Sequence, residues 1–372
     1  MKRPHRTPTG SAGATPKERT RSRTFKTRKD ANNHLATIRS DLHTGHYTDP
    51  QAGKTRFGDW INEWHQSRIG LRPTTKARDE AHITNLFQPH LATQQLRQLT
   101  PATIRTWITT IDQTHAPATI HKTHQLVKAA LQQAVTDGLI PTNPCATTPL
   151  PRVEKTEHRY LTIDEVHHLA NTIDPRYRAL VYTGALAGLR PGETAALHID
   201  DIDFLRKTLR VERTATEIAG HLDYGPPKTK AGRRTIAIPD VLADVLAQHL
   251  ATYPSETPFV FTTATRKPIR WTNLRRRQWR QAVEGSPVGA PMVPHDLRHT
   301  HAALAINEGV HAKILQARMG HSSISVTMDI YGGLFPGFDE GVATALDDAF
   351  SASFVSEPCQ KPAGDVVALS TK

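Results

Sequence analysis

The chain has 372 residues, 37% of them hydrophobic, and 47 Lys or Arg against 35 Asp or Glu give a formal net charge of +12. This length allows two or three domains, and the basic excess favours a polyanionic partner such as nucleic acid. The two cysteines, Cys145 and Cys359, lie far apart and exclude a disulfide framework and a cysteine-based zinc site. No apolar run approaches the ~20 residues of a membrane span, and the N-terminus lacks the apolar segment of a signal peptide, so we expect a cytoplasmic protein.

Positive charge is concentrated at the N-terminus. Residues 1–30 hold ten Lys or Arg and two acidic residues, and therefore carry +8 of the net +12. This pattern predicts a basic arm, although a solvated tail explains residues 1–20 equally well. A short strand is expected to end near residues 23–25, and a helix capped by Thr27 to follow it. Residues 44–56 are rich in turn formers and indicate a linker.

Residues 57–140 are predicted to be entirely helical. Trp60, Ile61 and Trp64 belong to one apolar stripe, and Thr100 before Pro101 is a cap followed by a proline at the first helical position. The next two stripes have helical spacing, which favours core packing. They comprise Ile104, Trp107, Ile108 and Ile111, and then Leu126, Val127, Ala130, Leu131 and Val135.

A proline-rich segment at residues 141–157 predicts an extended linker and the main domain boundary. Thr162 and Glu165 have the spacing of a capping box that opens the next helix. The remaining segment mixes helices with strands: strands are expected at 209–211 and 235–239, flanking a turn region at 225–228. Helices are expected at 176–187, 241–250, 273–284, 297–308, 311–318 and 323–331.

Six side chains scattered through the second half of the chain have the chemistry needed to cut a phosphodiester with a tyrosine and without a metal. Two arginines can balance the charge of a pentacoordinate phosphate, a tyrosine can attack, and a lysine can protonate the leaving 5′ oxygen. Two histidines can move the tyrosine proton or donate to the phosphate. In chain order, the set is Arg190, Lys228, His295, Arg298, His321 and Tyr331.

Spacing supports part of this set. His295 and Arg298 are three residues apart, so a helix presents both to one side, with His299 and His301 off that alignment. Glu193 follows Arg190 by three residues and is placed to orient its guanidinium. A helix capped by Ser322 or Ser323 would bury one face bearing Ile324, Met328 and Tyr331.

A zinc site built from His295, His299 and His301 is the competing interpretation of the histidines. The spacing of His295 and His299 suits zinc, but the glutamate of the common His-Glu-x-x-His motif is absent and Arg298 between them would repel a cation. We therefore expect neither a metal nor a cofactor.

The ordered motifs resemble those of the tyrosine recombinases, the phage integrase family, especially integrases of actinobacterial phages and integrative elements. Ala187-Gly188-Leu189-Arg190-Pro191-Gly192-Glu193 is similar to their first box, and Pro227-Lys228-Thr229 before Arg233-Arg234-Thr235-Ile236 to their lysine hairpin. Their second box is matched by His295-Asp296-Leu297-Arg298-His299-Thr300, by Met319-Gly320-His321-Ser322-Ser323-Ile324 and by Tyr331.

The resemblance implies an α+β fold and a specific domain organisation. A mainly α catalytic domain with a small β-sheet would occupy residues 158–350, a helical SAM-like core-binding domain residues 56–140, and a partial arm-binding module residues 1–50, with a flexible tail at 351–372. A C-terminal helix near 337–350 would dock on a neighbouring subunit.

The resemblance also implies residue roles and partners. Arg190, His295, Arg298 and His321 would bind the phosphate and handle protons, Lys228 would be the general acid, and Tyr331 would form a 3′-phosphotyrosyl link. The partners would be double-stranded attachment-site DNA, further copies in a homotetramer, a DNA-bending host factor and an excisionase. A chromosome or plasmid resolvase, a type IB topoisomerase and a non-catalytic DNA-binding protein of the same fold are the alternatives.

Overall fold

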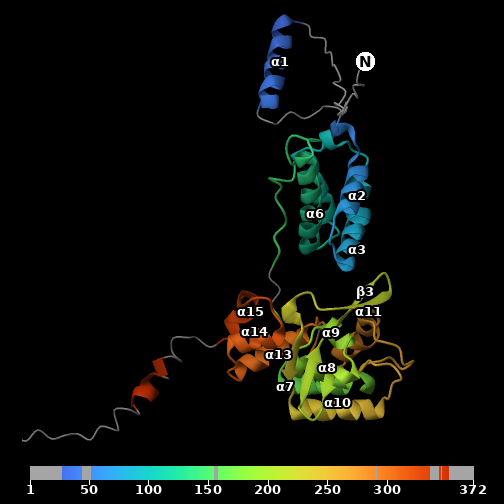
Figure 1. The fold of residues 1–372 in the computed structure, drawn as a ribbon, viewed down its shortest axis with the longest axis vertical. Helices are drawn as coiled ribbons and strands as arrows, with labels where there is room; N and C mark the ends of the chain where they lie inside the picture. Colours follow the sequence, from blue (N-terminus) through green and yellow to red (C-terminus); the bar gives the residue numbers. More distant parts are fainter. Residues whose placement is uncertain are drawn as a thin grey trace, which may run out of the picture. The chain divides into compact units, whose positions relative to one another are not determined.

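The computed structural model describes residues 27–43, 52–154, 158–289, 291–335, 343–344 and 346–351. The chain divides into two compact units, residues 1–153 and 154–372, which are treated separately below (Figure 1). The strand expected at 23–25, residues 44–51 of the expected linker and nearly all of the 351–372 tail lie outside the described residues. In the described part, no helix has both the length and the apolar character needed to cross a bilayer.

Helix α1 (Arg28–His43) begins where its predicted cap stands. The Thr27 hydroxyl accepts a hydrogen bond from the backbone N–H of Asp30 at 3.1 Å, which satisfies one of the free amides of the first turn. Leu35 is half exposed, so its side chain is not part of a core.

The rest of the first unit is helical, as predicted for residues 57–140. Trp107 and Trp60 anchor its core, and each buried indole N–H donates to a backbone carbonyl, that of Leu86 at 2.9 Å and that of Ala130 at 3.1 Å. The predicted cap at Thr100 is confirmed, because its hydroxyl accepts from the N–H of Thr103. The helices are α2 (Phe57–Ser67), α3 (Pro73–His82), α4 (Gln88–Leu91), α5 (Pro101–Asp112) and α6 (Pro117–Thr136).

The second unit is built around α8, a helix buried on nearly all sides. The capping box predicted before α7 is present: Thr162 accepts from the N–H of Glu165, whose carboxylate accepts from the N–H of Thr162. Helices α13, α14 and α15 lie together at one side of the unit (Figure 1). The helices are α7 (Ile163–Thr172), α8 (Arg178–Ala187), α9 (Pro191–Ala195), α10 (Asp240–Thr252), α11 (Trp271–Leu274), α12 (Arg280–Glu284), α13 (Asp296–Asn307), α14 (Ala312–Met319) and α15 (Ile324–Tyr331).

Two small antiparallel sheets complete this unit. The first has the order β1-β2-β5, with β1 at Ile202–Asp203, β2 at Thr208–Val211 and β5 at Arg234–Ala237. The second is the hairpin of β3 (Thr214–Ile218) and β4 (His221–Gly225). Strands are present at both expected places, 209–211 and 235–239, although the second ends at Ala237, and they pair with each other, with Leu209 opposite Ile236.

The hairpin and β1 were not predicted. Every residue of β3 is half-buried, so this strand has no alternation of apolar and polar faces to reveal it. Its turn has positive φ at both Ala219 and Gly220, the geometry of a tight hairpin connection.

Helix α15 differs from the prediction in its cap and in its buried face. Ser323 occupies the N-cap position, but its side chain makes no cap hydrogen bond. Ile324 is 37% exposed and so is not part of the buried face, whereas Tyr331 is buried as predicted, together with Thr327. One turn of helix separates these two residues, so they lie one above the other against α13 and α14. Farther on, residues 337–342 of the expected C-terminal helix are outside the described part, whereas 343–344 and 346–351 are helical.

Candidate active site

The backbone around Arg190 presents its guanidinium at a sharp junction between helices. Helix α8 ends at Gly188, whose φ of +65° closes the helix in the left-handed conformation that glycine adopts readily. Arg190 is the extended N-cap residue of α9, and Pro191 after it disfavours a helical conformation at Arg190. Glu193 orients the side chain as predicted, with its Oε1 accepting from Arg190 Nη1 at 2.8 Å.

Arg298, near the start of α13, is 2% exposed. Its Nη1 donates to the carbonyl of Gly188 at 2.7 Å and its Nη2 to that of Met319 at 2.5 Å, so it ties α13 to the ends of α8 and α14. Burial and the nearby Arg190 lower the pKa of Arg298 to about 9, and the side chain remains a cation at neutral pH. Arg190 Nη2 donates in turn to the carbonyl of Gly320 at 3.3 Å.

His321 and His295 complete the rim of the site as neutral rings. His321 is buried, and its Nδ1 lies 2.9 Å from the hydroxyl of Thr327. Burial, Arg298 and Arg190 lower the pKa of His321 to about 4. The same three causes lower the pKa of His295. A neutral imidazole can still donate one hydrogen bond to a phosphate oxygen.

Tyr331, the last residue of α15, is 1% exposed and stacks its ring parallel to His321, with centroids 6.4 Å apart. Its hydroxyl lies 2.8 Å from Nδ1 of His299. Burial raises the pKa of Tyr331 to about 12, although Arg298 acts in the opposite direction. The tyrosine is therefore protonated in the structure.

Five of the six predicted residues are thus linked by hydrogen bonds, ring contacts or charge interactions within the second unit. The sixth, Lys228, is exposed and follows Pro227 in the segment between β4 and β5. That placement agrees with the expected position on a turn between strands.

Sequence comparison supplies the family. The model described as "Phage integrase family" matches residues 159–335, and "Phage integrase central domain" matches residues 57–149. The chain belongs to the phage integrase family of tyrosine recombinases. It is 28% identical over 298 residues to the putative prophage phiRv2 integrase of Mycobacterium tuberculosis, covering 78% of this chain and 77% of that protein.

Solved integrases share the fold. The Tn1549 transposon integrase in complex with transposon right end DNA has a TM-score of 0.68 and 19% identity, covering 80% of this chain and all of that one. A lambda integrase tetramer bound to a Holliday junction has a TM-score of 0.61 and 18% identity, covering 85% and 90%. The helical first unit and the α+β second unit of this integrase-family chain therefore have known structural counterparts.

Sequence reasoning missed His299, the residue that contacts the tyrosine hydroxyl of this integrase-family chain. His295 was expected to move the tyrosine proton or to hold the phosphate. The hydrogen bond observed at Tyr331 is made by His299, and His295 lies edge-on to the His299 ring at 5.0 Å. Burial and the adjacent His158 lower the pKa of His299 to about 3, so its ring is a neutral acceptor.

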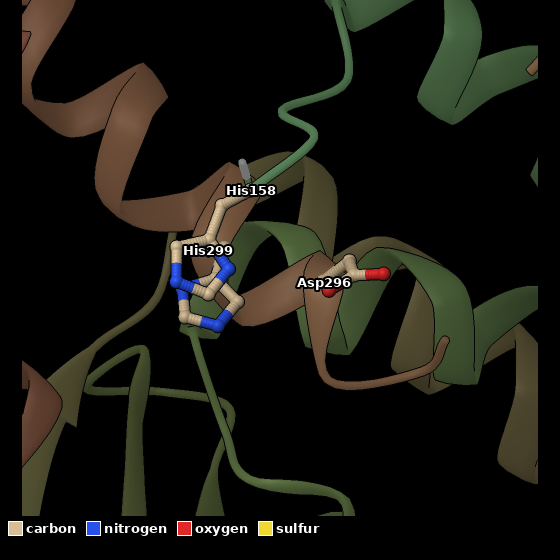
Figure 2. Close-up of side chains that lie close together, drawn as sticks. All are labelled: His158, Asp296 and His299. Carbon is tan, nitrogen blue, oxygen red and sulfur yellow. The ribbon is translucent and has the colours of Figure 1, made fainter. Parts of the chain in front are cut away.

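His158, Asp296 and His299 lie close together, but their arrangement does not suit a metal ion. The two imidazoles are stacked 4.1 Å apart with planes 23° apart, and the Asp296 carboxylate lies to one side of them (Figure 2). Because nearly parallel rings direct their in-plane lone pairs in nearly parallel planes, the two do not meet at one ion. Asp296 Oδ2 instead accepts from the N–H of Val293 at 2.7 Å.

His301, one of the three histidines considered for a zinc site, makes hydrogen bonds to the protein instead. His301 is buried, its Nδ1 lies 3.0 Å from the carbonyl of Ala185, and its Nε2 accepts from Arg318 at 2.9 Å. Both ring nitrogens are therefore engaged, and His301 holds α13 against α8 and α14.

Proposed function

We propose that this chain is a site-specific DNA recombinase that integrates or excises a phage or mobile element, with Tyr331 as its nucleophile. The observation that carries the proposal is the convergence of two arginines, a neutral histidine and a buried tyrosine on one point. Arg190 and Arg298 supply permanent positive charge, and Arg190 has a side chain 36% exposed and able to reach a phosphate. His321 supplies a further donor.

In the proposed reaction, Tyr331 Oη attacks the phosphorus of the scissile diester and the 5′ oxygen leaves. A 3′-phosphotyrosyl bond forms as the P–O5′ bond breaks, and the 5′ oxygen takes a proton from Lys228. A 5′-hydroxyl of the partner strand then attacks the phosphotyrosine and releases Tyr331. Because one phosphodiester replaces another at each step, ATP is not consumed. The arginines balance the charge that develops on the phosphate.

The proton that Tyr331 loses must pass to a base near its hydroxyl. His299 accepts from Oη in the structure, and His295 lies next to His299. We therefore propose that both histidines belong to the proton path, with His299 in direct contact. His299 is thereby added to His295, which was expected to move this proton or to hold the phosphate.

The surroundings of His295 support a DNA partner. A cavity of about 860 Å³ extends from Pro191 and His295 to three arginines of the segment 275–280. Those side chains, Arg275, Arg276 and Arg280, are exposed. Glu284 also lines the cavity and pairs with Arg280, so Arg275 and Arg276 supply its net positive charge, which is suited to a nucleic acid backbone.

The remaining assignments are proposals that extend the family membership. We propose that residues 158–350 are catalytic, that 56–140 bind the core DNA site, that 141–157 link them and that 1–50 bind an arm site, with 351–372 as a tail. The recombining unit would be a homotetramer on paired attachment sites at the nucleoid, assisted by a DNA-bending host factor and an excisionase.

The test is covalent trapping on a nicked duplex that releases a short 5′-hydroxyl fragment after cleavage. Wild type should form a denaturation-resistant protein–DNA adduct that Tyr331→Phe does not form, while Tyr331→Phe retains DNA affinity. Tyr177→Phe, which changes another buried tyrosine of the same unit, is the matched control and should form the adduct normally. An adduct of undiminished yield in Tyr331→Phe would refute the assignment.

A further inference from the structure

The C-terminal end of α14 accepts hydrogen bonds from three arginines through three consecutive carbonyls. Arg298 donates to Met319 O and Arg190 to Gly320 O, as described above, and Arg234 donates from Nε to Arg318 O at 2.6 Å. The preceding carbonyls, of Gln316 and Ala317, are taken by the N–H groups of His321 and Gly320. The end of a helix carries partial negative charge and unpaired carbonyls, so it suits a cluster of cations.

Arg234 is the member of this cluster to which no role has been given. Its side chain is 6% exposed, on the inward face of β5. Its Nη1 donates to Gly232 O at 3.0 Å and to Glu193 Oε1 at 3.3 Å, and its Nη2 donates to Glu193 Oε2 at 3.0 Å. Every nitrogen of the guanidinium is therefore engaged by the protein, and the group is sequestered from a substrate.

Glu193 connects this buried arginine to the proposed phosphate site. Its carboxylate is 2% exposed and accepts from both Arg190 and Arg234. Burial alone would raise the pKa of Glu193, but its ion pairs with Arg234 and, to a lesser extent, Arg190 outweigh burial and lower the pKa. One carboxylate is thus shared by two guanidinium groups, one inside the protein and one at the site.

We propose that Arg234 is a positioning residue that sets the orientation and free charge of Arg190 through Glu193, an inference that rests on the proposed function. Arg234 donates to both oxygens of the carboxylate. The side chain of Arg190 therefore bonds Glu193 through Nη1 alone, beside the backbone N–H of Arg190, and keeps Nη2 toward Gly320 O. Without Arg234, the whole negative charge of Glu193 is available to Arg190. The guanidinium then turns toward the carboxylate and neutralises less of the charge on the bound phosphate.

The experiment compares single-turnover strand cleavage on two nicked duplexes, one with the natural scissile phosphate and one with an uncharged methylphosphonate at that position. Arg234→Ala should cleave the natural duplex about 10²-fold more slowly than wild type, because a small misplacement of a charged group has an effect of this size. DNA affinity should change little. Arg233→Ala is the matched control, since Arg233 is the neighbouring arginine, 60% exposed, and should cleave like wild type.

The methylphosphonate separates positioning from general damage to the fold. Removing the phosphate charge removes the need for Arg190, so the deficits of Arg190→Ala and Arg234→Ala relative to wild type should shrink together on this duplex. A purely structural defect would leave the deficit of Arg234→Ala the same on both duplexes and would overturn the proposal. In addition, Arg190→Ala/Arg234→Ala should cleave no more than about twofold more slowly than Arg190→Ala, because the proposed effect passes through Arg190.

Arg234→Lys keeps the inference testable where Arg234→Ala folds poorly. Lysine retains the charge but not the planar pair of bonds to Glu193, so an intermediate rate that recovers on the methylphosphonate is expected. A Lys variant as fast as wild type would overturn the proposal. If wild type itself forms no Tyr331-dependent adduct, the proposed function fails; if it does and Arg234→Ala matches Arg233→Ala, only this inference fails.

Discussion

The hydroxyl oxygen of Tyr331 lies 2.8 Å from Nδ1 of His299, and both side chains are buried. Because burial raises the pKa of the tyrosine to about 12 and lowers that of the histidine to about 3, both groups are neutral at pH 7. The tyrosine then donates and Nδ1 accepts, which places the ring proton of His299 on Nε2. The proposed nucleophile is therefore held in its protonated form by a specific acceptor.

Replacing His299 by Ala should leave the buried tyrosine hydroxyl without its acceptor. We expect a loss of about 1–3 kcal/mol of stability and cleavage at least tenfold slower. His299→Asn, whose amide oxygen can accept in place of Nδ1, should recover part of both. The rate of adduct formation and urea unfolding are the measurements, with His168→Ala as an exposed control away from the site. Cleavage at the wild-type rate in His299→Ala would show that Tyr331 needs no such partner.

Gly320→Ala should disrupt the arginine cluster. Its φ is +63°, and a Cβ atom there would lie 2.7 Å from Ala231 O and 3.1 Å from Arg234 Nη1. Gly309 also has a positive φ, +75°, but open space around it, so Gly309→Ala carries only the cost of the backbone conformation, about 1–2 kcal/mol. Gly320→Ala should be less stable than Gly309→Ala and slower in single-turnover cleavage. Equal behaviour of the two variants would contradict this account.

Replacing the two arginines of the phosphate site, Arg190 and Arg298, should lower the free energy of unfolding by different amounts. Arg298→Ala leaves the carbonyls of Gly188 and Met319 without a buried donor and should cost about 2–5 kcal/mol. Arg190→Ala leaves Glu193 paired with Arg234 and should cost less than about 1 kcal/mol. Both variants should lose cleavage. Denaturant unfolding would contradict the prediction if Arg190→Ala proved the less stable of the two.

Acid should destabilise the chain through its buried neutral histidines. Burial and a neighbouring charge lower the pKa of His301 to about 3 and that of His321 to about 4, against 6.5 for an ordinary histidine. The unfolded chain thus binds more protons below pH 6.5, and the free energy of unfolding falls as pH drops from 6.5 to about 4, by about 1 kcal/mol per pH unit for each ring.

Urea unfolding at several pH values measures this proton uptake. His301→Gln should take up about one proton fewer on unfolding in that window. The exposed His168, changed to Gln, should leave the dependence on pH as in wild type. An unaltered dependence in His301→Gln would show that His301 is protonated in the folded chain.

The basic N-terminus should govern the salt dependence of DNA binding. Deleting residues 2–26 removes eight Lys or Arg and one Glu. If these side chains bind phosphates, the plot of log affinity against log salt concentration becomes less steep, by close to one unit for each phosphate that the arm neutralises in the full chain. A slope that stays unchanged after the deletion would show that the arm does not bind DNA phosphates.

Structural features that depend only on residues close together in sequence were predicted correctly. The Thr162–Glu165 capping box and the pairing of Arg190 with Glu193 follow from spacing alone, and both are present. The period of two along β5 would also have placed Arg234 on the inward side, because Ile236 is buried while Arg233 and Thr235 are exposed.

The role of His299 could not be predicted in this way. The prediction that His299 lies off the alignment of His295 and Arg298 is wrong, because its ring lies edge-on to that of His295 at 5.0 Å and contacts the tyrosine hydroxyl. Which side of α13 faces α15 is set by packing between α8, α13 and α14, residues far apart in sequence, and helical spacing carries no information about it. The same limit applies to the three carbonyls at the end of α14, since backbone groups leave no signature in a sequence.

The arginine cluster also affects the stability of the protein when no DNA is bound. Arg190, Arg234 and Arg298 bring three positive charges together, and Glu193 returns one negative charge. The three guanidinium groups therefore repel one another, and a tetrahedral oxyanion bound at Arg190 would relieve that repulsion. Sulfate or inorganic phosphate in the storage buffer should raise the melting temperature beyond what chloride of equal ionic strength achieves, and Arg190→Ala should abolish most of that difference.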